Sequence, residues 1–361
     1  MKKIIIIAAA VLAVAACKTA PGTGYTLKGN ISGLTGRVYL TVFDGHSLVR
    51  IDSTDANNGR FTFEGERETP VFATIQTRDG DVARFFLENE KISIQGAVAD
   101  PAGIKVKGSA TDRLYRSIRE KTDAMESAAM SSSGMTYEIY DSILTVINGV
   151  LTDFIKANPQ SVASAFILYS ELSFWMEAEE IDAMLAGFDS SVRRSEYYRL
   201  LEKMSATMKN TAVGKRFTDV SLPDKDGNTV SLSAMVGEGR YVLLDFWASW
   251  CGPCVGEAPN LVAAHKAYAP KGFGIYAVSL DESKADWLEA ATGLHFDWIN
   301  VCDLKGWSGE SVTDYAVRSI PANFLIGPDG TIIARNLRGS ALDEKLAELM
   351  PDTSQPTAGT K

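Results

Sequence analysis

The chain has 361 residues, a length that two or three domains commonly share. Its hydrophobic fraction of 45% and charged fraction of 22% are those of a globular protein with ample chain to bury a core. It carries 36 basic and 45 acidic residues, which gives a formal charge of −9. This acidic balance argues against nucleic acid or an anionic lipid surface as an electrostatic partner, and no long basic run offsets it.

A short apolar segment opens the chain. Lys2 and Lys3 precede the 13 apolar residues 4–16, fewer than the roughly 20 that a membrane-spanning helix needs. This pattern is typical of a signal peptide, here residues 1–16. The small residues before Cys17 resemble the lipobox of bacterial lipoproteins, which implies an acylated Cys17 that anchors the protein to a membrane surface. The alternatives are an ordinary secretory signal and an uncleaved anchor.

Residues 25–108 are expected to form a β-rich domain. Segments rich in β-branched and aromatic residues alternate there with turn sequences such as Asn-Asn-Gly at 57–59 and Asp-Pro at 100–101. The predicted strands are 37–43, 60–64, 71–76 and 91–95. They favour a small antiparallel sandwich or barrel-like sheet. His46 stands alone in a turn sequence, so we expect a solvated side chain and no chemistry in this domain.

Residues 109–210 are expected to be helical. Thr111 and Asp112 can cap a first helix that runs past Met125, and Ser-Ser-Ser-Gly at 131–134 ends it. Further helices are predicted at 137–157, 161–174, 177–188 and 195–209. Aromatic and methionine stripes on these helices could line a ligand groove. Core packing explains them better, because every helix of a bundle must bury one face.

Residues 211–350 alternate between predicted strands and helices, which indicates an α/β sheet. The predicted strands are 230–232, 241–247, 274–279, 322–326 and 331–334, and the predicted helices are 254–269, 283–292 and 340–350. Pro-Asp-Gly at 328–330 predicts a hairpin turn between the last two strands. Residues 351–361 are expected to be a disordered tail. The sequence thus predicts a multidomain chain with an N-terminal antiparallel β-domain, a central helical region and a C-terminal α/β domain.

The chain has four cysteines: Cys17, Cys251, Cys254 and Cys302. With Cys17 acylated, the other three are too few for a framework of structural disulfides. One close pair and one leftover is instead the pattern of a working thiol pair. Cys302 lies outside that pair, and we expect it to be a buried, inert thiol.

Cys251 and Cys254 lie where a predicted strand leads into a predicted helix. The unpaired N–H groups and partial positive charge of a helix N-terminus favour a thiolate at the first cysteine. One helical turn brings the second sulfur close enough to form a disulfide, and Pro253 costs no hydrogen bond there. We expect Cys251 to be the exposed nucleophile and Cys254 the buried resolving thiol.

A lone pair of cysteines at this spacing could also bind a metal. A structural zinc site needs four ligands, and this chain has no second such pair. Only His46, His265 and His295 are available elsewhere. We therefore expect neither a metal nor a cofactor.

The segment Asp-Phe-Trp-Ala-Ser-Trp-Cys-Gly-Pro-Cys at 245–254 resembles the active-site segment of thioredoxins. The wider frame, about 140 residues from Gly214 onward, resembles the TlpA/ResA-like periplasmic thioredoxins. The resemblance implies a thioredoxin-like fold for residues 211–350, a Cys251–Cys254 disulfide and thiol–disulfide oxidoreductase activity. More loosely, the whole chain resembles lipoproteins of gut-type Gram-negative bacteria in which an uncharacterised β-domain precedes such a domain.

The resemblance also implies roles for two acidic residues near the cysteines. Asp245 matches the buried aspartate that assists proton transfer at the resolving cysteine of thioredoxins, and many TlpA/ResA relatives lack it. A carboxylate in an apolar strand should have a raised pKa, as proton transfer near neutral pH requires. Glu257 matches an acidic residue of ResA-like proteins that tunes the thiols and binds partners. The alternative for Glu257 is a solvated helix residue.

The remaining matches concern the partner protein. Ile320-Pro321, before an apolar strand, matches the cis-proline loop that faces the cysteines and pairs with extended substrate backbone. Trp250 matches the aromatic shield of the active site, with simple packing as the alternative. Together with Gly252 and Pro253 of the motif, these residues are the predicted substrate contacts.

The sequence therefore predicts a membrane-anchored thiol–disulfide oxidoreductase facing the periplasm, with protein disulfides as substrates. The Gly-Pro spacer, identical to that of thioredoxin, favours a reductase, which needs a membrane electron donor of the DsbD or CcdA type. The alternative is a binding or assembly lipoprotein that uses the thioredoxin fold as a docking module. A thiol peroxidase fits poorly, because residues 248–251 read Ala-Ser-Trp-Cys and not Thr-x-x-Cys.

Overall fold

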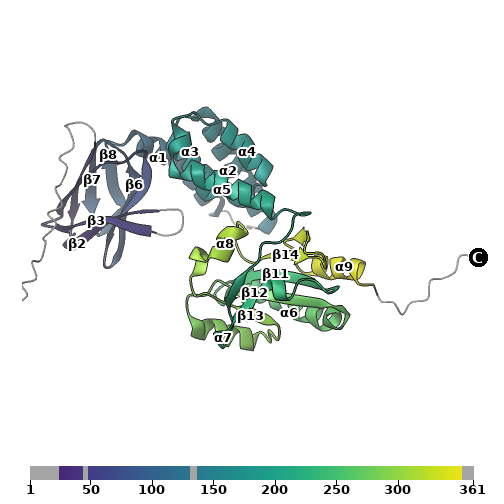
Figure 1. Ribbon diagram of the computed structural model, residues 1–361. Coiled ribbons are helices and arrows are strands. Elements are labelled where there is room, and N and C mark those ends of the chain that lie inside the picture. Colours follow the sequence, from purple (N-terminus) through teal and green to yellow (C-terminus); the bar gives the residue numbers. More distant parts are fainter. Residues whose placement is uncertain (1–23, 44–47, 131–135, 352–361) are drawn as a thin grey trace, which may run out of the picture. The chain divides into compact units, whose positions relative to one another are not determined.

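The computed structural model describes residues 24–351 except 44–47 and 131–135 (Figure 1). The expected signal peptide, the acylation site at Cys17, the loop histidine His46, the break at 131–134 and residues 352–361 of the tail lie outside the described residues. Contacts divide the chain into two compact units. The first takes in the described residues up to Ser117, apart from Phe43 and Leu48, and the second takes in the rest.

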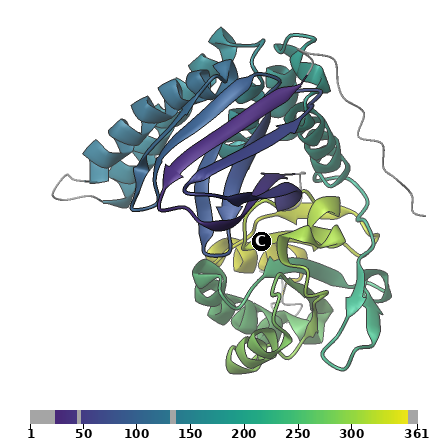
Figure 2. The ribbon, with the colours of Figure 1, turned by 90° about the vertical axis from the view of Figure 1, so that its left-hand side faces the viewer.

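The first unit contains two four-stranded sheets, with strand orders β4-β1-β7-β8 and β3-β2-β5-β6. The strands are β1 (Tyr25–Ser32), β2 (Gly36–Phe43), β3 (Leu48–Ala56), β4 (Arg60–Gly65), β5 (Val71–Thr77), β6 (Gly80–Leu87), β7 (Lys91–Ala97) and β8 (Asp100–Lys107). Figure 2 shows them side by side in purple and blue. In β1 every second side chain is buried, as in a sheet that covers a core with one face.

The β-rich prediction is confirmed, with two corrections. β1 pairs with β7 in parallel, so the unit is not purely antiparallel. The segment at 100–101 was predicted as a turn, but it begins strand β8. The predicted turn at 57–59 is present, and Asn58 and Gly59 both have positive φ angles, of 50° and 80°. These angles suit a two-residue hairpin turn, in which asparagine and glycine are the favoured residues.

Helix α1 (Ala110–Met130) begins in the first unit, and its cap differs from the prediction. Ser109, and not Thr111 or Asp112, supplies the capping oxygen: its Oγ accepts the N–H of Asp112 at 2.9 Å. Asp112 instead accepts the N–H of Phe86 at 3.0 Å through its own carboxylate. This contact ties the first turn of the helix to strand β6.

The helical part of the second unit contains α2 (Tyr137–Ala157), α3 (Val162–Ile167), α4 (Ala178–Ala186) and α5 (Glu196–Asn210). The helix predicted at 161–174 stops being α-helical after Ile167. It continues as a π-helix, Leu168–Leu172, and a short 3₁₀ turn. Apolar residues of these helices form a buried core, as expected from packing, and Ile181 and Leu201 are fully buried.

The α/β part of the second unit contains a five-stranded sheet of order β13-β12-β11-β14-β15. Its strands are β11 (Tyr241–Trp247), β12 (Phe273–Ser279), β13 (Ile299–Val301), β14 (Ala322–Ile326) and β15 (Ile332–Arg335). The helices are α6 (Gly252–Tyr268), α7 (Lys284–Gly293), α8 (Glu310–Asp314) and α9 (Ser340–Leu349). β9 (Ser221–Pro223) and β10 (Thr229–Ser231) form a small hairpin before them.

The directions of these strands place the candidate site. β12 runs parallel to β11, whereas β14 is antiparallel to it, with Phe246 paired to Ala322. The end of β11, the end of β12 and the start of β14 therefore meet at one edge of the sheet. No described helix combines the length and apolarity that a membrane-spanning segment requires.

Candidate active site at Cys251 and Cys254

The cysteines lie at the junction between β11 and α6. β11 is buried from Val242 to its end, so its position in the sheet is fixed by packing on both faces. Cys251 is the N-cap of α6, with extended backbone, and Pro253 occupies the first helical turn. Proline is tolerated there because the first N–H groups of a helix have no partner within it.

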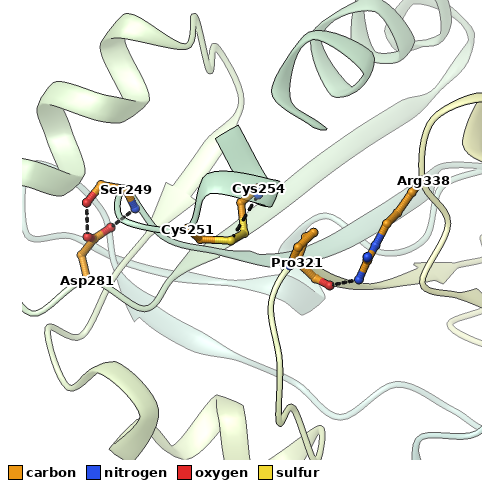
Figure 3. The surroundings of a disulfide bond; sticks show 6 residues. All are labelled: Ser249, Cys251, Cys254, Asp281, Pro321 and Arg338. Carbon is orange, nitrogen blue, oxygen red and sulfur yellow. Dashed lines mark hydrogen bonds between the residues drawn. A yellow bond between two sulfur atoms is a disulfide. The ribbon is translucent and has the colours of Figure 1, made fainter. Parts of the chain in front are cut away.

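Cys251 and Cys254 form a disulfide, with their Cα atoms 5.2 Å apart (Figure 3). The Sγ atom of Cys251 also accepts the backbone N–H of Cys254 at 3.2 Å. This donor is one of those that a helix N-terminus leaves unpaired. In the reduced protein the same N–H group and the helix dipole would stabilise a thiolate at Cys251.

The expected difference in exposure between the two cysteines is absent. Cys251 is 5% exposed and Cys254 is 4% exposed, so both are buried in the disulfide form. The expectation of an exposed Cys251 is therefore wrong for the oxidised protein. The reason is the capping geometry, because the side chain of Cys251 folds back over the first turn of α6 to accept the N–H of Cys254.

Asp245 lies within β11 and is 3% exposed. Burial, which penalises the charged form, raises the pKa of its carboxyl from 3.8 to about 7. The negative charge of Glu257 contributes to this rise, and the positive charge of Arg338 opposes it. A carboxyl group with a pKa near 7 can accept and release a proton at neutral pH.

Glu257 lies on α6 and both of its carboxylate oxygens have partners within the protein. Oε1 accepts the backbone N–H of Gly339 at 2.7 Å, and Oε2 accepts the side-chain amide of Asn260 at 3.0 Å. Glu257 is therefore half-buried and held in place, unlike a solvated helix residue. Its charge acts on Asp245, which connects it to the chemistry of the site.

The peptide bond between Ile320 and Pro321 is cis, as the resemblance implied. Figure 3 shows Pro321 beside the disulfide, with its carbonyl directed away from the sulfur atoms toward Arg338. The guanidinium of Arg338 donates a hydrogen bond to that carbonyl. The cis-proline loop is thus held from the side opposite the disulfide.

Trp250, directly before Cys251, is 56% exposed, so it is not a packed core residue. Its ring lies 6.3 Å from the ring of Trp307, centroid to centroid, and Trp307 is 41% exposed. Trp307 was not among the predicted site residues, because it lies in a short turn, Gly306–Ser308, far along the chain. Nothing in its spacing indicates a place near the cysteines.

Asp281 was also absent from the predicted site residues. This buried carboxylate accepts the N–H of Ser249 at 3.0 Å and the hydroxyl of Ser249 at 2.5 Å (Figure 3). Ser279 donates to it as well, at 2.6 Å. Asp281 comes just after β12, which is parallel to β11, and the ends of neighbouring parallel strands meet at one edge of a sheet. An acidic residue after a predicted parallel strand was therefore a signal in the sequence for a place near the cysteines.

Cys302 is a free, buried thiol, as expected. Burial raises the pKa of this thiol. Its Sγ atom contacts the carbonyl of Asp281 at 3.3 Å and accepts the N–H of Leu304 at 3.4 Å. Within the described ranges, no three His, Cys, Asp or Glu residues gather in a group that could hold a metal ion.

Two family models match the chain. The AhpC/TSA family matches residues 213–335, and a domain of unknown function, DUF4369, matches residues 25–115. The DUF4369 match covers the strands of the first unit and the start of α1. The AhpC/TSA match contains both cysteines, Asp245 and the cis-proline loop.

The chain is also similar to curated proteins and solved structures. It is 30% identical over 159 residues to the thiol–disulfide oxidoreductase ResA of Bacillus thuringiensis subsp. konkukian, covering 43% of this chain and 82% of that one. It is 30% identical over 136 residues to ResA of Bacillus subtilis, covering 38% and 73%. A solved structure of a thiol–disulfide oxidoreductase from Bacteroides fragilis is 39% identical to this chain, with a TM-score of 0.36. The match covers 37% of this chain and 99% of that one.

The domain has a disulfide at a helix N-terminus, a buried aspartate and a cis-proline. Together these features define a thioredoxin-like thiol–disulfide oxidoreductase domain. With the identity and coverage given above, the chain belongs to the ResA family of thiol–disulfide oxidoreductases. The resemblance of the C-terminal domain to ResA-like thioredoxins is therefore confirmed.

Proposed function

We propose that this protein reduces disulfides of other proteins, with Trp-Cys-Gly-Pro-Cys at 250–254 as its active site, while anchored by lipid on the periplasmic side of a membrane. The observation that carries the activity is the Cys251–Cys254 disulfide, which lies beside Pro321 and whose Cys251 caps α6. Asp245 is buried in β11, the strand that leads to it. Export and anchoring rest on the sequence of residues 1–17 alone.

The reduced enzyme would act in two exchange steps. The thiolate of Cys251 attacks one sulfur of the partner's disulfide, forming a mixed disulfide and releasing the other sulfur as a thiolate. Cys254 then gives its proton to the Asp245 carboxylate and attacks Cys251. The second partner thiolate leaves and takes up a proton. Two electrons have moved to the partner, and the Cys251–Cys254 disulfide has formed.

The partner would bind across the cis-proline loop and the exposed start of α6. Gly252 and Pro253 are exposed beside the buried cysteines, so a partner segment can approach the disulfide there. Trp250 and Trp307 offer apolar surface next to that approach. The backbone of Ile320, next to Pro321, is suited to pair with an extended partner segment, as the resemblance implied.

The reducing direction is the part of the proposal that the Gly-Pro spacer supports. Thioredoxin, with the same spacer, has a potential of about −270 mV, whereas the oxidant DsbA lies at about −120 mV. Each turnover leaves this enzyme oxidised, so a membrane electron donor of the DsbD or CcdA type must reduce it. Equilibration of the Cys251–Cys254 pair with dithiothreitol buffers should give a potential near that of thioredoxin. A value near that of DsbA would make the protein an oxidant.

Anchoring has a separate test. Labelling of the full-length protein with radioactive palmitate in a Gram-negative host should mark the wild type and not a Cys17→Ala variant. Equal labelling of both, or none of either, would overturn the anchor without touching the redox activity.

Replacing the resolving cysteine tests the activity on protein disulfides. A Cys254→Ser variant should accumulate mixed disulfides through Cys251, visible as larger species on non-reducing gels that collapse on reduction. A Cys251→Ser/Cys254→Ser variant is the control and should form none. If Cys254→Ser traps no partner while wild-type protein still binds partners without exchange, the domain is a docking module of an assembly lipoprotein.

A further inference from the structure

The loop between β15 and α9, residues 336–339, contacts the candidate active site at two points. The guanidinium of Arg338 donates to the carbonyl of Pro321, and the backbone N–H of Gly339 donates to Glu257 Oε1 at 2.7 Å. Figure 3 shows Pro321 between the disulfide and Arg338. The cysteine motif predicts neither contact, because this loop lies more than 80 residues further along the chain.

The loop is fixed to the strand that follows the cis-proline. Asn323 in β14 is 1% exposed, and its side chain donates to the carbonyl of Leu337 at 2.7 Å and accepts the N–H of Leu337 at 2.9 Å. The N–H of Asn336 donates to the carbonyl of Asn323 at 2.8 Å. These hydrogen bonds to Asn323 hold the backbone of the loop, and so place Arg338 beside the cis-proline. The position of the Arg338 backbone therefore does not depend on the Arg338 side chain.

Arg338 also supplies the positive charge that acts on the buried carboxyl group of Asp245. Asp245 is buried in β11, and the charges that act on it are those of Glu257 on α6 and Arg338. The residues paired with Asp245 in the neighbouring strands, Ala277 in β12 and Asn323 in β14, carry no charge. Arg338 lowers the pKa of Asp245, against the effects of burial and Glu257.

We propose that Arg338 is a positioning residue for disulfide exchange. It connects the cis-proline loop, which binds the partner, with Asp245, which accepts the proton of the resolving cysteine. One guanidinium holds the carbonyl of Pro321 and at the same time favours the charged form of Asp245. The proposal deepens the proposed function and rests on it, because it assigns Arg338 a part in reducing a protein disulfide.

Two substitutions in the full-length protein separate the two contributions. Arg338→Lys keeps the positive charge but lacks the fork of donors that reaches the Pro321 carbonyl. Arg338→Gln keeps a donor group and removes the charge. Arg240→Gln is the control, because Arg240 is a half-exposed arginine at the opposite end of β11 whose partner is Glu238.

Insulin reduction tests the contact with the cis-proline loop. Both Arg338 variants should raise the KM for insulin about 3- to 10-fold, the equivalent of one lost hydrogen bond. Neither variant should raise the KM for the small linear disulfide bis(2-hydroxyethyl) disulfide, because it offers no backbone to pair with the loop. Arg240→Gln should match the wild type with both substrates.

The titration of Asp245 tests the charge and needs no partner. Carboxyl-carbon NMR of the oxidised protein, labelled at aspartate, should show the pKa of Asp245 raised by about one unit in Arg338→Gln and unmoved in Arg338→Lys. The pH at which kcat for insulin rises should move upward with it in Arg338→Gln alone.

The outcomes are distinct. The proposal is overturned if Arg338→Gln leaves either the KM for insulin or the titration of Asp245 unchanged. A wild-type protein that does not reduce insulin defeats the proposed function, and the NMR titration then still decides whether Arg338 acts on Asp245. If Arg338→Gln does not fold, Arg338→Lys decides: a raised KM with an unmoved titration supports the proposal, and a wild-type KM overturns it.

Discussion

Ser249 donates both its backbone N–H and its hydroxyl to the carboxylate of Asp281, at 3.0 and 2.5 Å. Ser249 lies two residues before Cys251, and Asp281 is buried just beyond the end of β12. This pair of hydrogen bonds holds the segment between β11 and α6 against the neighbouring strand. The position of the cysteine pair thus depends on a residue outside its own motif.

Removing this carboxylate should destabilise the domain. We expect Asp281→Ala to lower the free energy of unfolding by about 2–3 kcal/mol, because Ser249 and Ser279 would be left with unpaired donors in a buried place. Urea unfolding of the oxidised protein measures the loss. Asp226→Ala, at an exposed turn position, is the control and should change stability little. Equal unfolding midpoints for Asp281→Ala and the wild type would contradict this role.

The raised pKa of Asp245 makes stability depend on pH. The folded protein holds a proton that the unfolded chain releases, since the pKa is about 7 in the fold and 3.8 ordinarily. Stability should therefore fall as pH rises from about 4 to about 7, by up to roughly 4 kcal/mol, and then level off. Asp245→Asn should remove most of this fall. Urea unfolding at pH 4.5, 6 and 8 compares the two proteins, and parallel pH dependences would speak against a neutral buried Asp245.

Trp307 should contribute to binding of protein substrates. Its half-exposed ring lies beside that of Trp250, so an apolar side chain next to the partner's cysteine can pack against both. Trp307→Ala should raise the KM for insulin about 3- to 10-fold and leave kcat close to the wild type. Trp175→Ala is a matched control, because Trp175 is 72% exposed on the helical part of the unit. An unchanged KM in Trp307→Ala would exclude this contact.

Cys302 should be unreactive in the native protein. It is buried and its thiol pKa is raised by that burial, whereas Cys251 caps a helix N-terminus, which favours the thiolate. After mild reduction at pH 7, iodoacetamide should label Cys251 first and leave Cys302 unlabelled until denaturant is added. Peptide mapping by mass spectrometry distinguishes the sites. Labelling of Cys302 at the rate of Cys251 would show a second reactive thiol.

The sequence predicts the catalytic centre well because its signals are local. β11 is a continuous apolar run, and the predicted bounds of β11 and β14 are those observed. The burial of Asp245 follows from its place inside that run, and the cis-proline follows from a resemblance that covers the whole domain. These features depend on a few neighbouring residues and their order.

The parts that the sequence does not predict depend on residues brought together by the sheet. β13 and α8 are short, and β3 and β8 of the first unit lack clear alternation of buried and exposed side chains. Asp281, Trp307 and Arg338 reach the site only through the arrangement of strands and loops. The burial of Cys251 was missed because helix capping, rather than motif position, sets the direction of its side chain.

Reduction of insulin tests the central claim most directly. With dithiothreitol as electron source at pH 7, the wild-type protein should accelerate precipitation of the insulin B chain, and Cys251→Ser should give the rate of dithiothreitol alone. Catalysis that requires Cys251 would establish the pair as the working centre of a protein disulfide reductase. A wild-type protein that adds nothing to the rate of dithiothreitol would contradict that account.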